Sequence, residues 1–366
     1  MIKKMMAIGS AMFLLSLLAL AQQIIENSGK PLSKNAGRVI GLKEVLKITD
    51  ESGAFYFKYP RISAIGPDGS IFVQDNEQIL HFDKDGKFVR NYFKKGQGPG
   101  EMTNAFALIP NAQGLCIEAY APGKLVWFDG QGMLVKERPV RPAGRSLIIL
   151  QAIFSDMYIF SSSEFPAVTG EPQVLDNPCT IFCMKDGTEE LKKLQSFPVK
   201  AWVVTSGGGG GMSSMAPFFA VPLKSGFLVI VHTSEYLIKI LDVAANEVIR
   251  VFNRKYDRVE TPPAKPQEKA GTVMVNSMTP PRQKYLNDIS RIFVKSDAIW
   301  AVTSTRDPKK GVMIDVFNAA GAYTDSFYLN VPAGVQFFIF GDFCYTAEKN
   351  ADETYAIKKY KIEWKD

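Results

Sequence analysis

The sequence has few of the residues that most often build catalytic or metal centres. Its 366 residues include only two histidines and four cysteines. The patterns HExxH, DxDxDG and GxSxG are missing, which excludes the common zinc, calcium and serine-hydrolase motifs. Asp-box repeats and Trp-Asp dipeptides are missing too. No motif therefore predicts an enzyme or a cofactor.

Strong or clustered charge is also missing. The formal net charge is +6, and Lys3 and Lys4 supply two of these charges. The short basic pairs elsewhere are scattered and are typical of solvated turns or strand edges. Nucleic-acid binding needs a concentrated basic surface. We therefore expect no nucleic-acid partner.

Long hydrophobic runs are confined to the first residues. An apolar run from Ala7 to Leu20 follows two lysines, and Ala19-Leu20-Ala21 has the small residues that signal peptidase requires. The run is too short for a comfortable membrane span, and no comparable run follows. We predict a signal peptide over 1–21 and an exported protein, periplasmic or extracellular. The first cysteine is Cys116, so we do not expect a lipoprotein.

The four cysteines do not form an evident disulfide pattern. Cys179 and Cys183 lie in the stretch CTIFC. In a strand their Cα atoms would be about 13 Å apart, beyond the ~7 Å limit for a bridge. Cys116 and Cys344 lie within apolar strand patterns. Buried free thiols are therefore favoured over disulfides.

Helical periodicity is almost absent, and a repeat of short alternating strands takes its place. The unit contains a turn, a strand, a polar break, a second strand, a Gly turn and a third strand. One further apolar run precedes each unit; these runs are RISAI (61–65), FALI (106–109), LIILQAIF (147–154), FFAVPL (218–223), DISRIFV (288–294) and VQFFIF (335–340). Blade-length periods of this kind predict an all-β, six-bladed β-propeller of four-stranded antiparallel blades.

The last unit lacks its outermost strand, and the N-terminal stretch RVIGLKEVLKITD (38–50) can supply it. Such closure would remove an exposed sheet edge. We therefore expect residues 22–366 to form one domain. The predicted blades are 60–100, 102–140, 146–199, 215–258, 287–330, and 334–364 plus the strand 38–50.

Two stretches carry a family resemblance. They are DNEQILHFDKDGKFVRNYFKKGQGPGE, from residue 75, and GDFCYTAEKNADETYAIKKYKI, from residue 341. With them the chain resembles the bacterial six-bladed β-propeller proteins related to NHL repeats, within the TolB-like propeller superfamily. The resemblance implies a binding or interaction module, and a minority of such relatives are lyases or hydrolases.

The glycine-rich stretch 96–101, GQGPGE, invites comparison with a phosphate-binding loop. A phosphate loop needs Gly-Lys-Ser/Thr at the start of a helix. Here Pro99 lacks an amide hydrogen, Glu101 would repel an anion, and a strand follows. The stretch is predicted to be a corner between two blades.

In an antiparallel blade, consecutive loops lie at alternate ends of the strands and therefore on the two opposite faces of the propeller. Plain Asp-Gly turns gather on one face, and the polar breaks and inter-blade links gather on the opposite one, which we call the loop-rich face. Two insertions belong there: the Gly/Ser stretch 204–217, which by composition is flexible or disordered, and the Pro-rich stretch 259–283. We expect a ligand on this face, with both insertions flanking the mouth of the central channel.

The predicted binding residues lie on this face or at the channel that opens onto it. Arg61 and Arg291, near the starts of inner strands, could meet an anion in the channel. Tyr120 and Tyr236, beside polar breaks, could stack on a sugar or peptide. The full candidate set is Arg61, Asp75, Asn76, Glu101, Tyr120, His232, Glu235, Tyr236 and Arg291. His81 is read as a satisfied strand residue.

The resemblance and the absence of a catalytic motif favour a non-catalytic binding protein with a protein, peptide or glycan ligand, and we expect a monomer without a cofactor. The alternative is a propeller lyase or hydrolase of the lactonase type with a site at the channel mouth. In its metal-assisted form it would hold a divalent cation through carboxylates and amides, for which Asn104, Asn287 and Asp288 are the candidates, with Glu101 near Asn104.

Overall fold

The computed structural model describes residues 23–50, 52–120, 123–140, 147–164, 166, 171–206, 209–224, 226–263 and 280–364. The predicted signal peptide lies outside these residues. Within them every regular element is a β-strand, which agrees with the all-β prediction. No helix of this part is long and apolar enough to cross a membrane.

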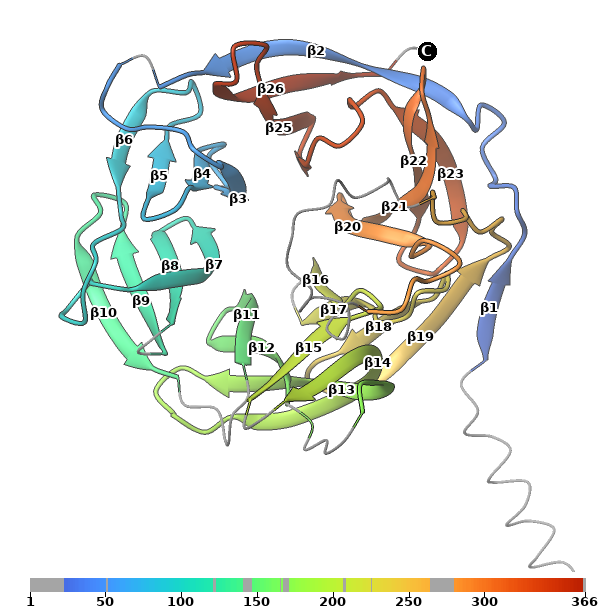
Figure 1. Ribbon diagram of the computed structural model, residues 1–366, viewed down its shortest axis with the longest axis horizontal. Coiled ribbons are helices and arrows are strands. Elements are labelled where there is room, and N and C mark those ends of the chain that lie inside the picture. Colours follow the sequence, from blue (N-terminus) through green and yellow to red (C-terminus); the bar gives the residue numbers. More distant parts are fainter. Residues whose placement is uncertain are drawn as a thin grey trace, which may run out of the picture.

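The sheets stand around a common axis in a propeller-like ring (Figure 1). The first sheet contains β3 (Arg61–Ile65), β4 (Ile71–Gln74), β5 (Ile79–Phe82) and β6 (Phe88–Asn91). The second contains β7 (Asn104–Asn111), β8 (Gly114–Tyr120), β9 (Lys124–Asp129) and β10 (Leu134–Pro139). In both sheets consecutive strands pair antiparallel, from the axis outward.

The next two sheets have a fifth strand each, which the sequence did not predict. One contains β11 (Leu147–Phe154), β12 (Met157–Ser163), β13 (Gln173–Lys185), β14 (Lys192–Ser206) and β15 (Gly209–Ser214). The other contains β16 (Phe219–Lys224), β17 (Phe227–Val231), β18 (Ile238–Asp242), β19 (Glu247–Arg254) and β1 (Ile24–Asn27). The strand β1 lies parallel to β19 on the outside of the ring (Figure 1).

The remaining strands form one eight-stranded sheet, in the order β20-β21-β22-β23-β2-β26-β25-β24. They are β20 (Ile289–Lys295), β21 (Ala298–Asp307), β22 (Gly311–Phe317), β23 (Tyr323–Leu329), β24 (Phe337–Phe340), β25 (Phe343–Lys349), β26 (Tyr355–Glu363) and β2 (Arg38–Ile48). The first residues of β2 pair parallel with β23, and the rest pair antiparallel with β26. The N-terminal strand thus pairs with the last strand of the chain, as predicted.

The core lies between neighbouring sheets. Phe72 from the first sheet and Leu115 and Ile117 from the second belong to one buried cluster, and similar clusters fill the other junctions. Middle strands such as β9 are buried on both faces because each sheet packs against two neighbours. Their sequences are therefore continuous apolar runs rather than alternating ones.

The stretch 204–217 differs from the prediction of a flexible segment. Residues Ala201–Ser206 of β14 pair antiparallel with β15 in a hairpin. A glycine run can adopt extended backbone, and here the ladder of hydrogen bonds to β14 holds it. The central part of the other insertion, 264–279, lies outside the described residues.

All four cysteines are free thiols. Cys116, Cys179 and Cys344 are buried, and Cys183 is partly buried. Burial raises the pKa of the Cys179 thiol to about 11 and that of Cys344 to about 12. These cysteines are therefore small core residues with little thiolate at neutral pH.

Candidate functional site

A cavity of about 590 Å³ lies at the centre of the ring. The innermost strands β3, β7, β11, β16, β20 and β24 all contribute side chains to it. Figure 1 shows these innermost strands arranged around the axis of the ring, so the cavity that their side chains line lies on that axis. Its lining contains two arginines and no carboxylate among the described residues.

The two arginines are Arg61, the first residue of β3, and Arg291, in β20. Both also line a small adjoining hollow beside Phe338. Arg61 donates from Nη2 to Oε1 of Gln74 at 2.8 Å, and Arg291 donates from Nη1 to the carbonyl of Phe337. Within the described part of the chain neither guanidinium has an ion-pair partner. Burial lowers the pKa of Arg291, and no nearby acid offsets this effect.

Bulges in the innermost strands direct side chains into the cavity. The pairing of β3, β7 and β11 with their second strands skips Ser63, Phe106 and Gln151, respectively. All three residues line the cavity. A bulge re-aims a side chain that regular alternation would send elsewhere, so a residue in the strand can face the axis.

Gln74 fixes the position of Arg61. Its Oε1 also accepts a hydrogen bond from Ser63 Oγ at 2.6 Å, and its Nε2 donates to the carbonyl of Ala105 at 2.9 Å. Gln74 therefore links the first sheet to the second at the level of the arginine. A side chain held in this way needs little further ordering when a ligand binds.

An aromatic pair stands beside this polar end. The rings of Phe106 and Tyr120 are 5.1 Å apart at 50°. Phe106 lines the cavity, whereas 51% of Tyr120 is exposed. Tyr120 ends β8 and is the one predicted stacking residue that remains accessible.

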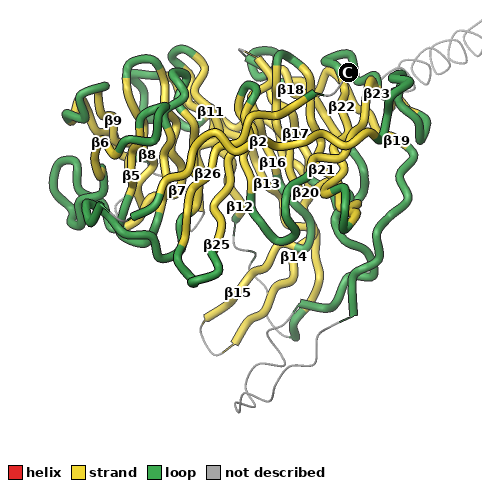
Figure 2. Tube along the Cα trace, turned by 90° about the horizontal axis from the view of Figure 1, so that it is seen from above, coloured by secondary structure: helices red, strands yellow, loops and turns green. Residues whose placement is uncertain are grey.

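The arginines lie toward the loop-rich face. Arg61 forms the first pair of its ladder, with Gln74, directly before the polar break that follows β4. On the same face, residues 173–178 of β13 and 198–203 of β14 extend past the end of β12, because Ser163 is the last residue of β12 that pairs with β13. Figure 2 shows this extension, with β15, projecting beyond the ring.

The opposite end of the cavity, next to the hairpin turns, is apolar. Val294 and Phe340 pair there with residues at the starts of the next strands. Ile109, Pro222 and Ile339 complete this end. The cavity is therefore cationic near one mouth and apolar toward the other.

Three other predicted residues stabilise loops. Asp75 is 1% exposed, and its carboxylate accepts the amide hydrogens of Lys58 and Tyr59 at 2.6 and 2.9 Å. Asn76 is exposed and adopts a left-handed turn conformation with a φ of 50°. Glu101 Oε2 accepts the amide hydrogen of Gly98 at 2.9 Å. None of the three lines the cavity.

Backbone amides in the corner that contains Glu101 donate hydrogen bonds to acceptors within the protein. Gly100 donates its amide hydrogen to Glu137 Oε1 at 2.6 Å, and Gly96 donates to the carbonyl of Met102. A φ of 153° at Gly96 favours glycine there. These amides are therefore engaged within the protein, as expected of a structural corner between β6 and β7.

Neither His232 nor Glu235 lines the cavity, and the two residues contact different partners. His232 is 4% exposed, and its Nδ1 lies 2.9 Å from the carbonyl of Pro198. Burial lowers the pKa of His232, so its ring is neutral at pH 7. Glu235 is exposed and lies 3.8 Å from Arg258.

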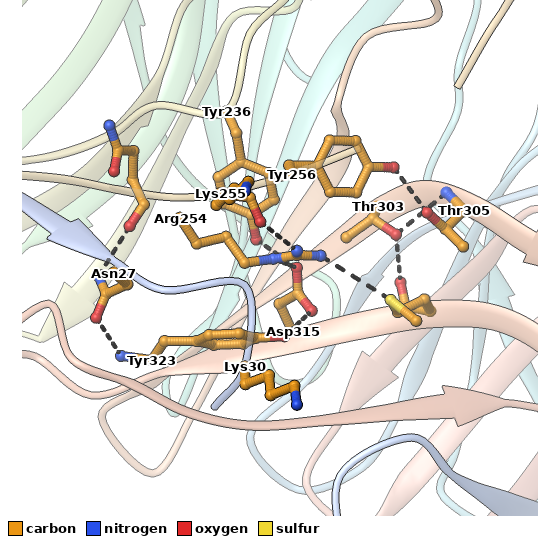
Figure 3. A network of polar contacts seen from close by, with 12 residues as sticks. Asn27, Lys30, Tyr236, Arg254, Lys255, Tyr256, Thr303, Thr305, Asp315 and Tyr323 are labelled. Atoms are coloured by element: carbon orange, nitrogen blue, oxygen red, sulfur yellow. Dashed lines mark hydrogen bonds and ion pairs between the residues drawn. The ribbon is translucent and has the colours of Figure 1, made fainter. Parts of the chain in front are cut away.

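Tyr236 belongs to a buried polar network between two sheets (Figure 3). Its hydroxyl donates to Asp315 at 2.7 Å, and the same carboxylate accepts from Tyr323 and Arg254, also at 2.7 Å. Only 6% of Tyr236 is exposed. Its ring is therefore not available to stack on a ligand.

Two of the three residues considered for a metal site, Asp288 and Asn104, have other partners. Asp288 is 2% exposed and accepts from Arg258 Nε at 2.9 Å, and Asn104 Oδ1 accepts the amide hydrogen of Ala105. Asn287 Oδ1 is buried without a partner. In the described ranges no group of three or more His, Cys, Asp or Glu side chains is placed to hold a metal ion.

A second cavity, of about 410 Å³, lies between the first and second sheets on the face of the Asp-Gly turns. His81 lines it and stacks on Phe72 with ring centres 4.6 Å apart. The Nδ1 atom of His81 is buried without a hydrogen-bond partner. The prediction that this histidine has all its hydrogen bonds is therefore wrong. Burial lowers its pKa, and the ring is neutral.

Comparisons with known proteins identify the fold. No family model matches the chain, and no curated protein matches it. The chain is similar to the crystal structure of BF0058, an inferred exported protein from Bacteroides fragilis, at 12% identity and a TM-score of 0.56, over 93% of this chain and 100% of that one. A gluconolactonase from Xanthomonas campestris aligns at 12% identity and a TM-score of 0.41, over 90% and 99% of the two chains. The first likeness supports a β-propeller fold.

Proposed function

We propose that this protein is an exported binding protein that holds an organic anion, without catalysis, at the loop-rich mouth of its axial cavity. Arg61 and Arg291 are the anion-binding residues. The observation that supports this most strongly is the pair of guanidinium groups in a cavity whose described lining contains no carboxylate. Arg61 is exposed and Arg291 is partly buried, and both remain charged at neutral pH. Two cations that line one cavity without a carboxylate create a positive potential that attracts an anion.

The architecture we propose is a ring of six blades related to NHL and TolB-like propellers. The eight-stranded sheet counts as two blades because β2 joins two sets of consecutive strands, β20–β23 and β24–β26. Export is proposed from the N-terminal stretch 1–21 and its signal-peptide pattern. We expect the protein to act as a monomer.

The chemistry of the mouth favours a carboxylate or phosphate group. A guanidinium is always charged and has five donors in a planar fork that can bind such a group with two parallel hydrogen bonds. Arg61 and Arg291 each use only one hydrogen bond within the described protein. Tyr120 and Phe106 offer rings to the body of a ligand beside the anionic group. A ligand with one anionic group and a less polar body would fit this description.

The test is thermal stabilisation of residues 22–366 by a panel of small anions, including acetate, benzoate, glucuronate and phosphate. A ligand that binds only the folded state stabilises it by about 2.7 kcal/mol at a hundredfold excess over Kd. We expect at least one anion to raise Tm, and R61Q and R291Q to abolish the effect. R306Q is the matched control. Arg306 is exposed, lies near the end of β21, where it pairs with Val312 on the loop-rich face, and does not line the cavity.

The alternative, a lactone or ester hydrolase, is tested on the same protein. Turnover of lactone or ester substrates that is lost with a chelator, together with one tightly held divalent ion per chain, would replace the binding proposal. Stabilisation by anions that is equal in the wild type, R61Q and R291Q would also overturn it.

A further inference from the structure

The axial cavity is asymmetric along its length. Its cationic end contains Arg61 and Arg291, and its apolar end contains Val294, Ile339 and Phe340. We propose that the ligand is an amphipathic organic anion, with a carboxylate at the arginines and an alkyl chain extending along the axis toward the hairpin turns. This inference rests on the proposed function and names its ligand class.

The polar groups below the arginines are already engaged within the protein. Ser63 Oγ donates to Gln74 at 2.6 Å, and Gln151 Nε2 donates to Ser161 Oγ at 2.9 Å. A ligand with many hydroxyl groups, such as a sugar acid, would leave those hydroxyls without partners deep in the cavity. Each buried and unsatisfied polar group costs about 1–3 kcal/mol, so a polar body is disfavoured there. An alkyl chain needs no partners and gains from leaving water.

The dimensions suit a single-chain ligand. A cavity of about 590 Å³ falls within the roughly 300–1,000 Å³ usual for small-molecule sites. Bulky side chains approach the axis from several strands, including Phe106, Phe219 and Phe340. Because these side chains make the lining apolar on several sides of the axis, the cavity suits a flexible alkyl chain better than a rigid polar ring system.

The experiment is a chain-length series. Even-numbered n-alkyl carboxylates from butanoate to dodecanoate are titrated into residues 22–366 by calorimetry, each below its micelle concentration. If the chain enters the apolar end, affinity rises roughly fourfold per added CH₂. The heat-capacity change becomes more negative with length because more apolar surface is buried. Octanoate should bind at least tenfold more tightly than 1-octanol, since the alcohol lacks the charge.

Variants separate the two ends of the cavity. R61Q and R291Q should weaken every carboxylate by about tenfold or more, because each loses a charged hydrogen bond. F340S should flatten the dependence on chain length and leave butanoate unchanged. Phe340 is 37% exposed, so this substitution spares the core, and V294S is a second variant at the same end. R306Q is again the control and should match the wild type.

The outcomes are distinguishable. Binding that depends on both arginines but not on chain length would overturn the alkyl-chain inference and leave the proposed function in place. Binding that rises with chain length but ignores both arginines, or equal affinity for octanoate and 1-octanol, would overturn both. If no carboxylate binds, whatever its length, the alkyl-chain inference is overturned, and the proposed function is overturned with it if the anion panel, phosphate included, also fails to bind.

Discussion

At the scale of single residues, Asp315 is the centre of a buried polar network. It is fully buried, and its two oxygens accept hydrogen bonds from Arg254, Tyr236 and Tyr323 (Figure 3). The Arg254 guanidinium also lies 5.2, 4.8 and 5.3 Å from the ring centres of Tyr236, Tyr256 and Tyr323, respectively. The network joins the β16–β19 sheet to the β20–β23 strands.

Substitution of Asp315 by alanine should destabilise the protein by about 3–5 kcal/mol, because Arg254 would remain buried without its counter-charge. Urea unfolding monitored by tryptophan fluorescence measures the change. D85A is the control, since the Asp85 side chain is 74% exposed and its surface ion pair is worth little. A loss below about 1 kcal/mol for D315A would show that the network contributes no net stability.

Glu118 connects stability to pH. It is 3% exposed in β8, and its Oε2 accepts the amide hydrogen of Leu150 in the neighbouring sheet at 2.8 Å. Burial raises the pKa of this carboxyl from 4.5 to about 7, although the hydrogen bond from Leu150 opposes the shift. Between these two values the folded state holds more protons than the unfolded state. The contribution of Glu118 to stability therefore falls as pH rises through this window.

E118Q removes this titration and keeps the acceptor for Leu150. We expect the free energy of unfolding of the wild type, minus that of E118Q, to fall by up to about 3 kcal/mol between pH 4.5 and 8. Urea unfolding of both proteins across that range gives the difference directly. A difference that is flat with pH, or that rises, would contradict the assignment of a raised pKa.

The candidate site residues differed in how far the sequence could predict them. Arg61 and Arg291 line the cavity, and their positions near the starts of inner strands are the part of the sequence that places them near the axis. Their role in binding stays a prediction. Tyr236 was wrongly assigned to an accessible position. Its burial depends on Asp315, which is distant in sequence and belongs to the next sheet, and no local pattern contains that contact.

At the scale of elements, the innermost strands were the most predictable. The apolar runs at 61–65 and 147–154 coincide with β3 and β11, and the other runs overlap their strands. These runs are distinctive because the strands pack on both faces and are bounded by turn residues. The strand β15 was missed, because a glycine run has neither alternation nor β-propensity and its pairing with β14 decides its structure.

The β7–β8 hairpin offers a sharp test of backbone geometry. Gly114 has a φ of 151°, and an added Cβ would lie 2.0 Å from the backbone carbonyl oxygen of Phe128. That oxygen belongs to the paired strand and cannot move away cheaply. G114A should therefore lower the free energy of unfolding by about 1–3 kcal/mol, as measured by urea unfolding.

Gly130, in the turn between β9 and β10 of the same sheet, is the matched control. A Cβ added there would meet nothing within 4 Å. G130A should change stability by less than about 0.5 kcal/mol, as expected for an unconstrained surface position. Equal effects of the two substitutions would contradict the close approach of β8 and β9 at Gly114.

At the scale of the whole molecule, the N-terminal strand determines how the ring closes. Residues Gly41–Ile48 of β2 pair with β26, and Arg38–Ile40 pair with β23. One strand thus covers two sheet edges that would otherwise be open to pairing with other chains. Ile40 is fully buried in the same core cluster as Phe327 and Ile362, so the closure is also a packing contact.

Ring closure brings residues from the whole chain to one axis. Arg61 and Arg291 are more than two hundred positions apart, yet both line the same cavity. Sequence analysis could place each arginine on an inner strand, but their shared cavity and its apolar opposite end depend on the assembled ring. The ligand class therefore follows from the three-dimensional structure.

The most direct measurement is a crystal structure of residues 22–366 with 12-bromododecanoate, with the bromine located by anomalous scattering. The account predicts carboxylate density between Arg61 and Arg291, and one bromine peak near Val294 and Phe340 at the apolar end. A bromine peak outside the axial cavity, or a carboxylate bound away from both arginines, would contradict the central claim.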